Sequence, residues 1–182
     1  MKTISRALVA ALVCFLAVSG CKKHETESSG EVASGFSFTV YPGAHYMAQL
    51  TETRKKALQM INPNEAAAPM AIYDVDAPVE QVAEYYAKAY GYNTVAPDAS
   101  NNLNVTKPPA YYRTGDLAAD QKPIASLLPK INLKTDLTKA VGSYKAAEIE
   151  AKPNRPRVTV QRPYFDVTTS QVVDRTMILM AR

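Results

Sequence analysis

The sequence has few of the residues from which common catalytic and metal sites are built. Only two histidines, His24 and His45, occur among its 182 residues, and no H-x-x-H, H-E-x-x-H or C-x-x-C spacing is present. Zinc sites usually take three or four ligands at such spacings, so we expect neither a metal nor a cofactor. The seven glycines are scattered, which argues against a phosphate-binding loop. No serine lies in a G-x-S-x-G motif, so the sequence predicts no catalytic residues.

No apolar run in the sequence is long enough to span a membrane. The longest extends over the twelve residues from Ala7 to Val18, whereas a transmembrane helix needs about 20. Two basic residues precede this run, and the small pair Ser19-Gly20 follows it. A charged start, a short apolar stretch and small residues are typical of an export signal. Residues 1–20 are therefore interpreted as a signal peptide and left out of the fold.

Cys21 follows this segment directly. The stretch Leu16-Ala-Val-Ser-Gly-Cys21 resembles the lipobox of bacterial lipoprotein signals. In that family the cysteine sulfur receives a diacylglyceryl group, the preceding peptide bond is cut, and the new amine is usually acylated, with palmitate among the chains. Because two or more acyl chains anchor a protein stably, the resemblance implies that the membrane is a permanent partner. The alternative is an ordinary cleaved signal in which Cys21 is incidental.

The residue after the cysteine bears on where the anchor resides. Lys22 occupies this position, and by resemblance to enterobacterial lipoproteins a residue other than Asp favours transfer to the outer membrane. We therefore expect a location in the cell envelope, at the periplasmic face of the outer membrane where the cell has two membranes. Cys14 would leave with the signal and Cys21 would carry lipid, so no disulfide could form within the mature chain.

An excess of charge of one sign is also missing. The whole chain has a net charge of +4, and loss of residues 1–20 would remove Lys2 and Arg6 and no acidic residue, which leaves +2. Binding of nucleic acid needs clustered basic side chains that replace counterions. We therefore expect no nucleic-acid partner.

Composition divides the remainder of the chain into two parts. Residues 21–35 are small, polar and charged, without hydrophobic periodicity. They are predicted to form the lipidated cysteine and a flexible tether with an end-to-end distance of about 20 Å. Residues 36–182 are numerous enough to form a single domain with a sizeable apolar core.

The clearest predicted element is a helix over residues 77–90. Apolar side chains recur there at helical spacing on one face, namely Val79, Val82, Ala83, Tyr86 and Tyr90. Such a stripe is typical of an amphipathic helix that packs on a core. We expect Asp76 to cap the start of this helix and Gly91 to end it.

Several stretches rich in β-formers predict a sheet. Strands are expected at 36–41, 45–53 and 70–75, and an antiparallel hairpin is expected from 157–166 and 172–180. Pro163 interrupts this hairpin and marks a bulge or an edge. We therefore predict an α+β fold, an antiparallel sheet of about four to six strands with one clear amphipathic helix packed on one face.

The middle of the domain has weaker patterns. Residues 93–123 predict a long loop with at most one short strand, at 103–106. Pro129 limits residues 124–131 to one or two helical turns. For residues 136–150 the pattern favours a helix in the first half and leaves the second half open between helix and edge strand.

Two motifs carry a second resemblance. In this sequence the motifs are Val40-Tyr-Pro-Gly-Ala44 and, after an expected strand, the stretch from Tyr73 to Tyr86. This resemblance is to a set of small, mostly uncharacterised bacterial envelope proteins that have a YPGA turn followed by a capped helix. The resemblance covers residues 36–92. It implies an α+β domain and does not imply any activity.

Three tyrosines are the candidates for ligand binding. Tyr85 lies beside the core stripe of the predicted helix, and Tyr111 and Tyr112 lie in the expected 93–123 loop. Aromatic faces of this kind stack on sugars or on partner proteins, and tyrosine also packs readily in a core with its hydroxyl kept wet. On the C-terminal hairpin, Arg162 and Arg175 are expected to face Asp166 and Asp174 across the strands.

These patterns together predict a membrane-anchored envelope lipoprotein without enzymatic activity, which binds or scaffolds an envelope protein partner. The alternative is a small-ligand or glycan-binding lipoprotein that uses the 93–123 loop. A hydrolase of unrecognised geometry is the third interpretation, and no motif favours it.

Overall fold

The computed structural model describes residues 38–63, 67–97 and 108–182. The predictions for the signal, for Cys21, for the tether and for a strand at 103–106 therefore lie outside the described residues.

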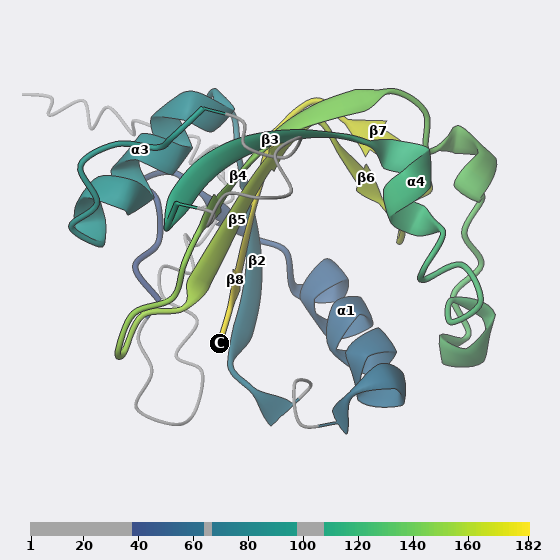
Figure 1. Ribbon diagram of the computed structural model, residues 1–182. Coiled ribbons are helices and arrows are strands. Elements are labelled where there is room, and N and C mark those ends of the chain that lie inside the picture. Colours follow the sequence, from purple (N-terminus) through teal and green to yellow (C-terminus); the bar gives the residue numbers. More distant parts are fainter. Residues whose placement is uncertain (1–37, 64–66, 98–107) are drawn as a thin grey trace, which may run out of the picture.

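The main sheet is antiparallel and has six strands in the order β1-β2-β8-β5-β4-β3. These strands are β1 (His45–Tyr46), β2 (Met70–Val75), β3 (Ala110–Asp116), β4 (Ser143–Ile149), β5 (Arg157–Arg162) and β8 (Thr176–Ala181). Two short strands, β6 (Tyr164–Asp166) and β7 (Gln171–Val173), form a second sheet. In Figure 1 the main sheet curves between helix α3 (Val79–Ala89) on one side and helix α1 (Ala48–Ile61) on the other. The α+β prediction is confirmed, with the strand number at the top of the expected range.

Helix α3 confirms the predicted amphipathic helix and closes one face of the sheet. Val82, Ala83 and Tyr86 are fully buried and pack in one cluster with sheet side chains such as Val158 and Met180. The helix is shorter than the predicted 77–90 range, with eleven residues. Its burial against β4 and β5 fixes the helix in place.

The ends of α3 differ in how well they were predicted. Pro78 stands at the N-cap, where no side chain makes a capping hydrogen bond. Asp76 instead forms an ion pair with Arg162 at 3.3 Å, so the predicted cap is wrong. Gly91 ends the helix with a φ of +74°, as predicted, because glycine adopts this conformation without strain from a Cβ atom.

The strand predicted at 45–53 is right only for its first two residues, which form β1. In the strand predicted at 36–41, the described residues 38–41 form no strand, although the side chain of Phe38 is buried in the cluster beneath α3. After the two residues of β1 the chain turns into helix α1. The residues of α1 are mostly good helix formers such as Ala, Leu, Gln, Lys and Arg, but only Leu50 and Thr51 are buried. Its apolar stripe is therefore too narrow to be recognised as a helix by periodicity.

The predicted loop at 93–123 is wrong in its second half, which forms strand β3 and helix α4 (Leu117–Gln121). Strand β3 pairs with β4 over its whole length, from Ala110 opposite Ile149 to Asp116 opposite Ser143. Pairing of this extent outweighs the weak local β signal, because strand formation depends on cross-strand contacts.

The segment between α4 and β4 contains only short helical turns. Two 3-10 helices, η1 (Pro129–Ile131) and η2 (Leu137–Lys139), occur there, which confirms one or two turns at 124–131 but not a helix over the first half of 136–150. The second half forms β4, which pairs with β3 and β5 and is therefore not an edge strand. Ala146 and Ala147 of β4 are buried on opposite faces of the sheet, and their small side chains allow other residues to pack closely on both faces.

The C-terminal hairpin is confirmed, because β5 pairs with β8 and β6 pairs with β7. Pro163, which follows a cis peptide bond, lies between the end of β5 and the start of β6, so the hairpin is interrupted at this residue as predicted. Strand β5 itself lies between β8 and β4, inside the sheet and not at an edge.

Candidate functional site

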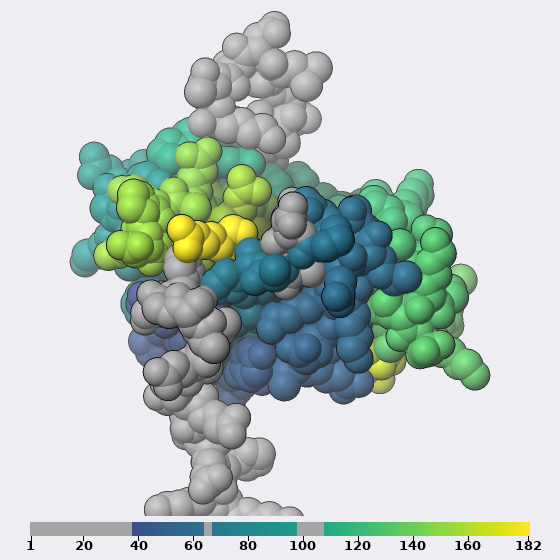
Figure 2. Space-filling view, turned by 90° about the horizontal axis from the view of Figure 1, so that it is seen from below, coloured from purple at the N-terminus to yellow at the C-terminus, as the bar shows by residue number. Residues whose placement is uncertain are grey.

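The face of the sheet opposite α3 is only partly covered and carries a groove of about 710 Å³. Its walls come from α1, from residues 120–128 and from the 164–167 segment, and its floor comes from strands of the main sheet. Figure 2, seen from below, shows the segment that includes α1 between the end of the sheet and residues 117–140. A groove of this volume lies within the range of pockets that hold small molecules, about 300–1,000 Å³.

Strand alternation determines which residues form the floor, because every second side chain points away from α3. One row of paired residues crosses the sheet from Ile72 to Leu179, then to Thr159 and Glu148. The floor therefore changes from apolar on β2 and β8 to polar on β5 and β4. Met70 and Met177 extend its apolar half.

A hydrogen-bonded network forms the polar bank of the groove. Arg113 Nε donates to Glu148 Oε1 at 2.9 Å, and Thr159 Oγ1 donates to Glu148 Oε2 at 2.7 Å. A second nitrogen of Arg113 donates to the hydroxyl of Tyr144, which donates in turn to Asp120 Oδ2 at 2.5 Å. Both oxygens of Glu148 are thereby engaged, so this bank is rigid.

The network also determines the protonation of its members. Burial alone would lower the pKa of Arg113, but its hydrogen bonds to Tyr144 and Glu148 outweigh burial and raise that pKa above its ordinary value. Burial, and then the hydrogen bond to Asp120, raise the pKa of Tyr144. At neutral pH the guanidinium therefore stays charged and the phenol stays neutral.

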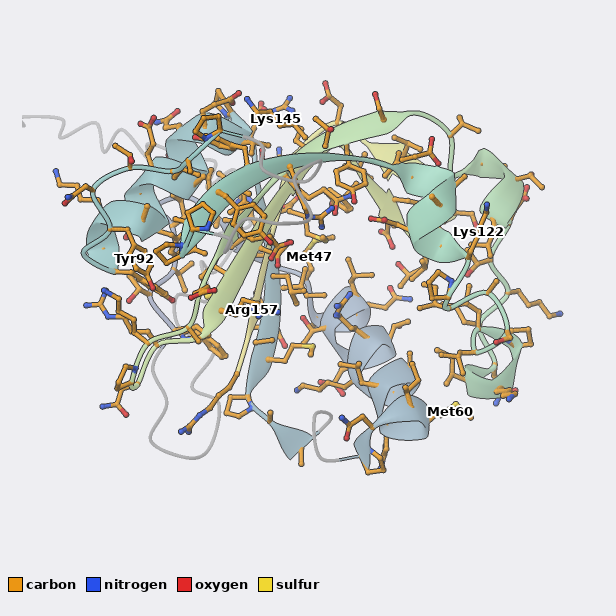
Figure 3. All side chains as sticks on the ribbon, in the orientation of Figure 1. Met47, Met60, Tyr92, Lys122, Lys145 and Arg157 are labelled. Atoms are coloured by element: carbon orange, nitrogen blue, oxygen red, sulfur yellow. The ribbon has the colours of Figure 1, made fainter. Side chains whose placement is uncertain are left out.

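Positive charge exceeds negative charge around the groove. Four arginines line it, Arg54, Arg113, Arg157 and Arg182, against the two carboxylates of Asp120 and Glu148. Arg113 pairs with Glu148. Arg157 is exposed, and no described residue forms an ion pair or hydrogen bond with its side chain. Figure 3 labels Arg157 on the sheet and Met60 near the end of α1.

The three tyrosines predicted as ligand-binding residues do not come together, and none lines the groove. The ring of Tyr85 packs edge-on against Tyr41 and Tyr86, at 5.0 and 5.1 Å between centroids. Tyr112 packs against the cluster beneath α3, with Lys145 Nζ 4.7 Å from its centroid. Tyr111 precedes it on β3 and therefore faces the opposite side of the sheet.

Several charged residues form ion pairs at the other end of β2, among them Arg162 and Arg175, which were singled out in the sequence. Asp74 lies 2.6 Å from Arg175 Nε and 3.8 Å from His45 Nδ1. Arg162 pairs with Asp174 at 2.8 Å, as predicted. Arg175 does not pair across the hairpin, and the carboxylate of Asp166 accepts hydrogen bonds from Thr168 instead. In the described part of the chain, His, Cys, Asp and Glu form no group of three or more that could hold a metal.

Sequence reasoning missed the groove because its residues come from segments whose structure was predicted wrongly or left open. Arg113 was assigned to a loop, and Glu148 lay in the segment left between helix and strand. A signal was present on β5, where Thr159 and Gln161 alternate with buried Val158 and Val160. This alternation indicates a central strand with one polar face.

Within residues 38–63, 67–97 and 108–182, no helix is long and apolar enough to span a membrane. Comparisons with protein-family models, with curated proteins and with solved structures found no match to this chain.

Proposed function

We propose that this chain is a lipid-anchored lipoprotein of the cell envelope, and that its folded domain binds another envelope component without catalysing a reaction. The observation that carries the binding role is the groove opposite α3, which has an apolar half and a polar, positively charged half. Partner surfaces and ligands are commonly recognised by this combination, in which apolar contact supplies affinity and a few polar groups supply orientation.

The anchor rests on the sequence that ends in Cys21. A basic start, a twelve-residue apolar run and the lipobox-like stretch before this cysteine support processing and acylation at this position. Lys22 favours the periplasmic face of the outer membrane. With a tether of about 20 Å, the domain would stay close to the membrane that holds it.

A binding role fits the polar bank better than a catalytic role does. The groove lining contains neither histidine nor cysteine, and both oxygens of Glu148 already accept hydrogen bonds from Arg113 and Thr159. These contacts hold Glu148 in an ion pair with Arg113. No observation on the described residues favours the hydrolase interpretation.

The glycan-binding alternative depended on Tyr111 and Tyr112 acting together. Because these residues are neighbours on a strand, their rings lie on opposite faces of β3, and Tyr85 packs against other tyrosines. One aromatic platform cannot form from the three. Small-ligand binding is therefore better supported at the groove.

Metabolic labelling with a fatty-acid analogue tests the anchor. We expect Cys21→Ser to abolish labelling and to release the protein from the membrane fraction, because acylation needs the thiol at this position. Cys14→Ser is the matched control, since it removes the other cysteine and should leave labelling unchanged. Labelling that persists in Cys21→Ser would contradict the proposal.

Site-specific photo-cross-linking in the cell tests the binding role. A photoreactive amino acid is placed in the full chain at Ala57, on the groove wall, and in a second version at Gln81, an exposed position of α3. We expect one envelope component to be recovered from position 57 and not from position 81. Equal recovery from both positions, or recovery from neither, would exclude the groove as the binding surface.

A further inference from the structure

The apolar half of the groove has the composition of a site for a flexible hydrocarbon chain. Its partly exposed apolar side chains include Leu58 of α1, Met177 of β8 and Ile124. Buried Met70, Ile72 and Leu179 also line it. Methionine side chains are unbranched and adapt to the shape of what they contact. Each methylene group of a ligand that is buried adds to its affinity, so a long chain gains most from such a surface.

The other half of the groove favours an anionic head group. Arg157 lies on β5 opposite Ala181 of β8, which places a guanidinium at the edge of the apolar floor. A guanidinium group matches a carboxylate with two parallel hydrogen bonds. Among the described residues no carboxylate is paired with Arg157, and the two acids of the lining, Asp120 and Glu148, already accept hydrogen bonds. The excess positive charge therefore faces whatever enters.

Two other ligand classes fit the lining less well. A sugar would require an exposed aromatic face, but the aromatic residues of the lining, Tyr164 and Phe165, are 2% and 6% exposed. A cationic amphiphile would meet the arginines.

We propose that the groove binds one long-chain fatty acid, with its carboxylate at Arg157 and its acyl chain over the methionines and leucines of β2, β8 and α1. The inference deepens the binding role proposed above, on which it rests, by naming the class of the bound component. Arg54 and Arg182 line the same groove.

The test uses the full chain reconstituted in dioleoylphosphatidylcholine vesicles and a hexadecanoic acid that carries a photoreactive diazirine. Cross-linked peptides are identified by mass spectrometry. We expect labelling at Leu58, Ile124 and Met177, which are partly exposed apolar residues of the lining, and competition by unlabelled hexadecanoate. Arg157→Gln should weaken competition about tenfold, because a charge-assisted hydrogen bond is lost. Arg157 is exposed, so the substitution should leave folding intact.

Two controls make the result specific. Arg155→Gln removes an exposed arginine that lies over the ring of Tyr90 and outside the groove, and competition should be unchanged. A diazirine-bearing hexadecanol of the same length should label the groove far less than the acid does, because it lacks the charge.

Several outcomes would overturn the inference. Equal labelling by the alcohol would remove the role of the carboxylate. Labelling confined to Met60, which is exposed at the end of α1 and outside the groove lining, would indicate contact with the bilayer instead. Equal loss in Arg155→Gln and Arg157→Gln would exclude a specific contact. If no fatty acid binds but position 57 still cross-links one envelope component, the inference fails while the proposed binding role stands.

Discussion

Tyr144 joins three neighbours on the groove face. Its hydroxyl lies between Arg113 and Asp120, the guanidinium of Arg113 lies 5.2 Å from the centre of its ring, and the ring itself covers Gly115, its partner on β3. A Cβ atom at residue 115 would overlap the ring. The polar bank of the groove therefore depends on Gly115, because a residue without a side chain leaves room for the ring of Tyr144.

We predict that Gly115→Ala destabilises the protein by about 1–3 kcal/mol, the usual cost of overpacking a site that cannot relax freely. Urea unfolding of the full chain measures this cost. The Tyr144→Ala background is the control, because removal of the ring leaves space for the methyl group. The double variant should then lose less stability than the two single variants together, and additive losses would show that the ring is not the cause.

At the scale of elements, helix α1 protects one edge of the sheet. Strand β1 pairs only with Tyr73 and Asp74 of β2. The start of α1 forms hydrogen bonds with the backbone groups of the next residue of β2. The amide of Met47 donates to the carbonyl of Ile72 at 2.8 Å, while the amide of Ile72 donates to Thr51 Oγ1 at 3.0 Å. Thr51 is fully buried, so its hydroxyl replaces a strand partner.

Thr51→Val tests this arrangement. The substitution keeps the shape of the side chain but leaves the buried amide of Ile72 without a partner, and we expect a loss of about 1–3 kcal/mol in the free energy of unfolding. Thr53→Val on the same helix is the matched control. Thr53 is half-buried on the groove wall, and its substitution should change stability by about 0.5 kcal/mol or less. Similar losses in both variants would contradict the special role of Thr51.

The same elements explain how far the sequence predicted the fold. Helix α3, strand β2 and the C-terminal hairpin were predictable because each has a wide apolar pattern that local spacing reveals. Helix α1 buries only Leu50 and Thr51, and β3 depends on pairing with β4. Contacts of this kind join distant segments, so no local pattern could place Arg113 beside Glu148.

At the scale of the whole molecule, the two faces of the sheet have different roles. The face beneath α3 is a closed core, in which Val82, Ile178 and Met180 are completely buried. The opposite face has a cluster of its own, in which Leu50 of α1 packs with Ile72 and Leu179. The groove lies on this face and has the half-buried Met177 in its lining. A closed core supplies stability, whereas partly exposed apolar side chains stay available for a ligand. The domain is thus stabilised from one side and proposed to bind from the other.

Two methionines of strand β8 allow this division to be measured within one element. Met180 is fully buried beneath α3, and Met177 is half-buried on the groove floor. We expect Met180→Ala to cost about 2–5 kcal/mol, because it leaves a cavity in a closed core. Met177→Ala should lower the free energy of unfolding by about 1 kcal/mol or less, because the side chain of Met177 is partly exposed and buries less apolar surface. Urea unfolding of the full chain compares the two variants on the same strand. Equal costs would mean that the groove face is closed in solution, and the proposed binding surface would then not exist.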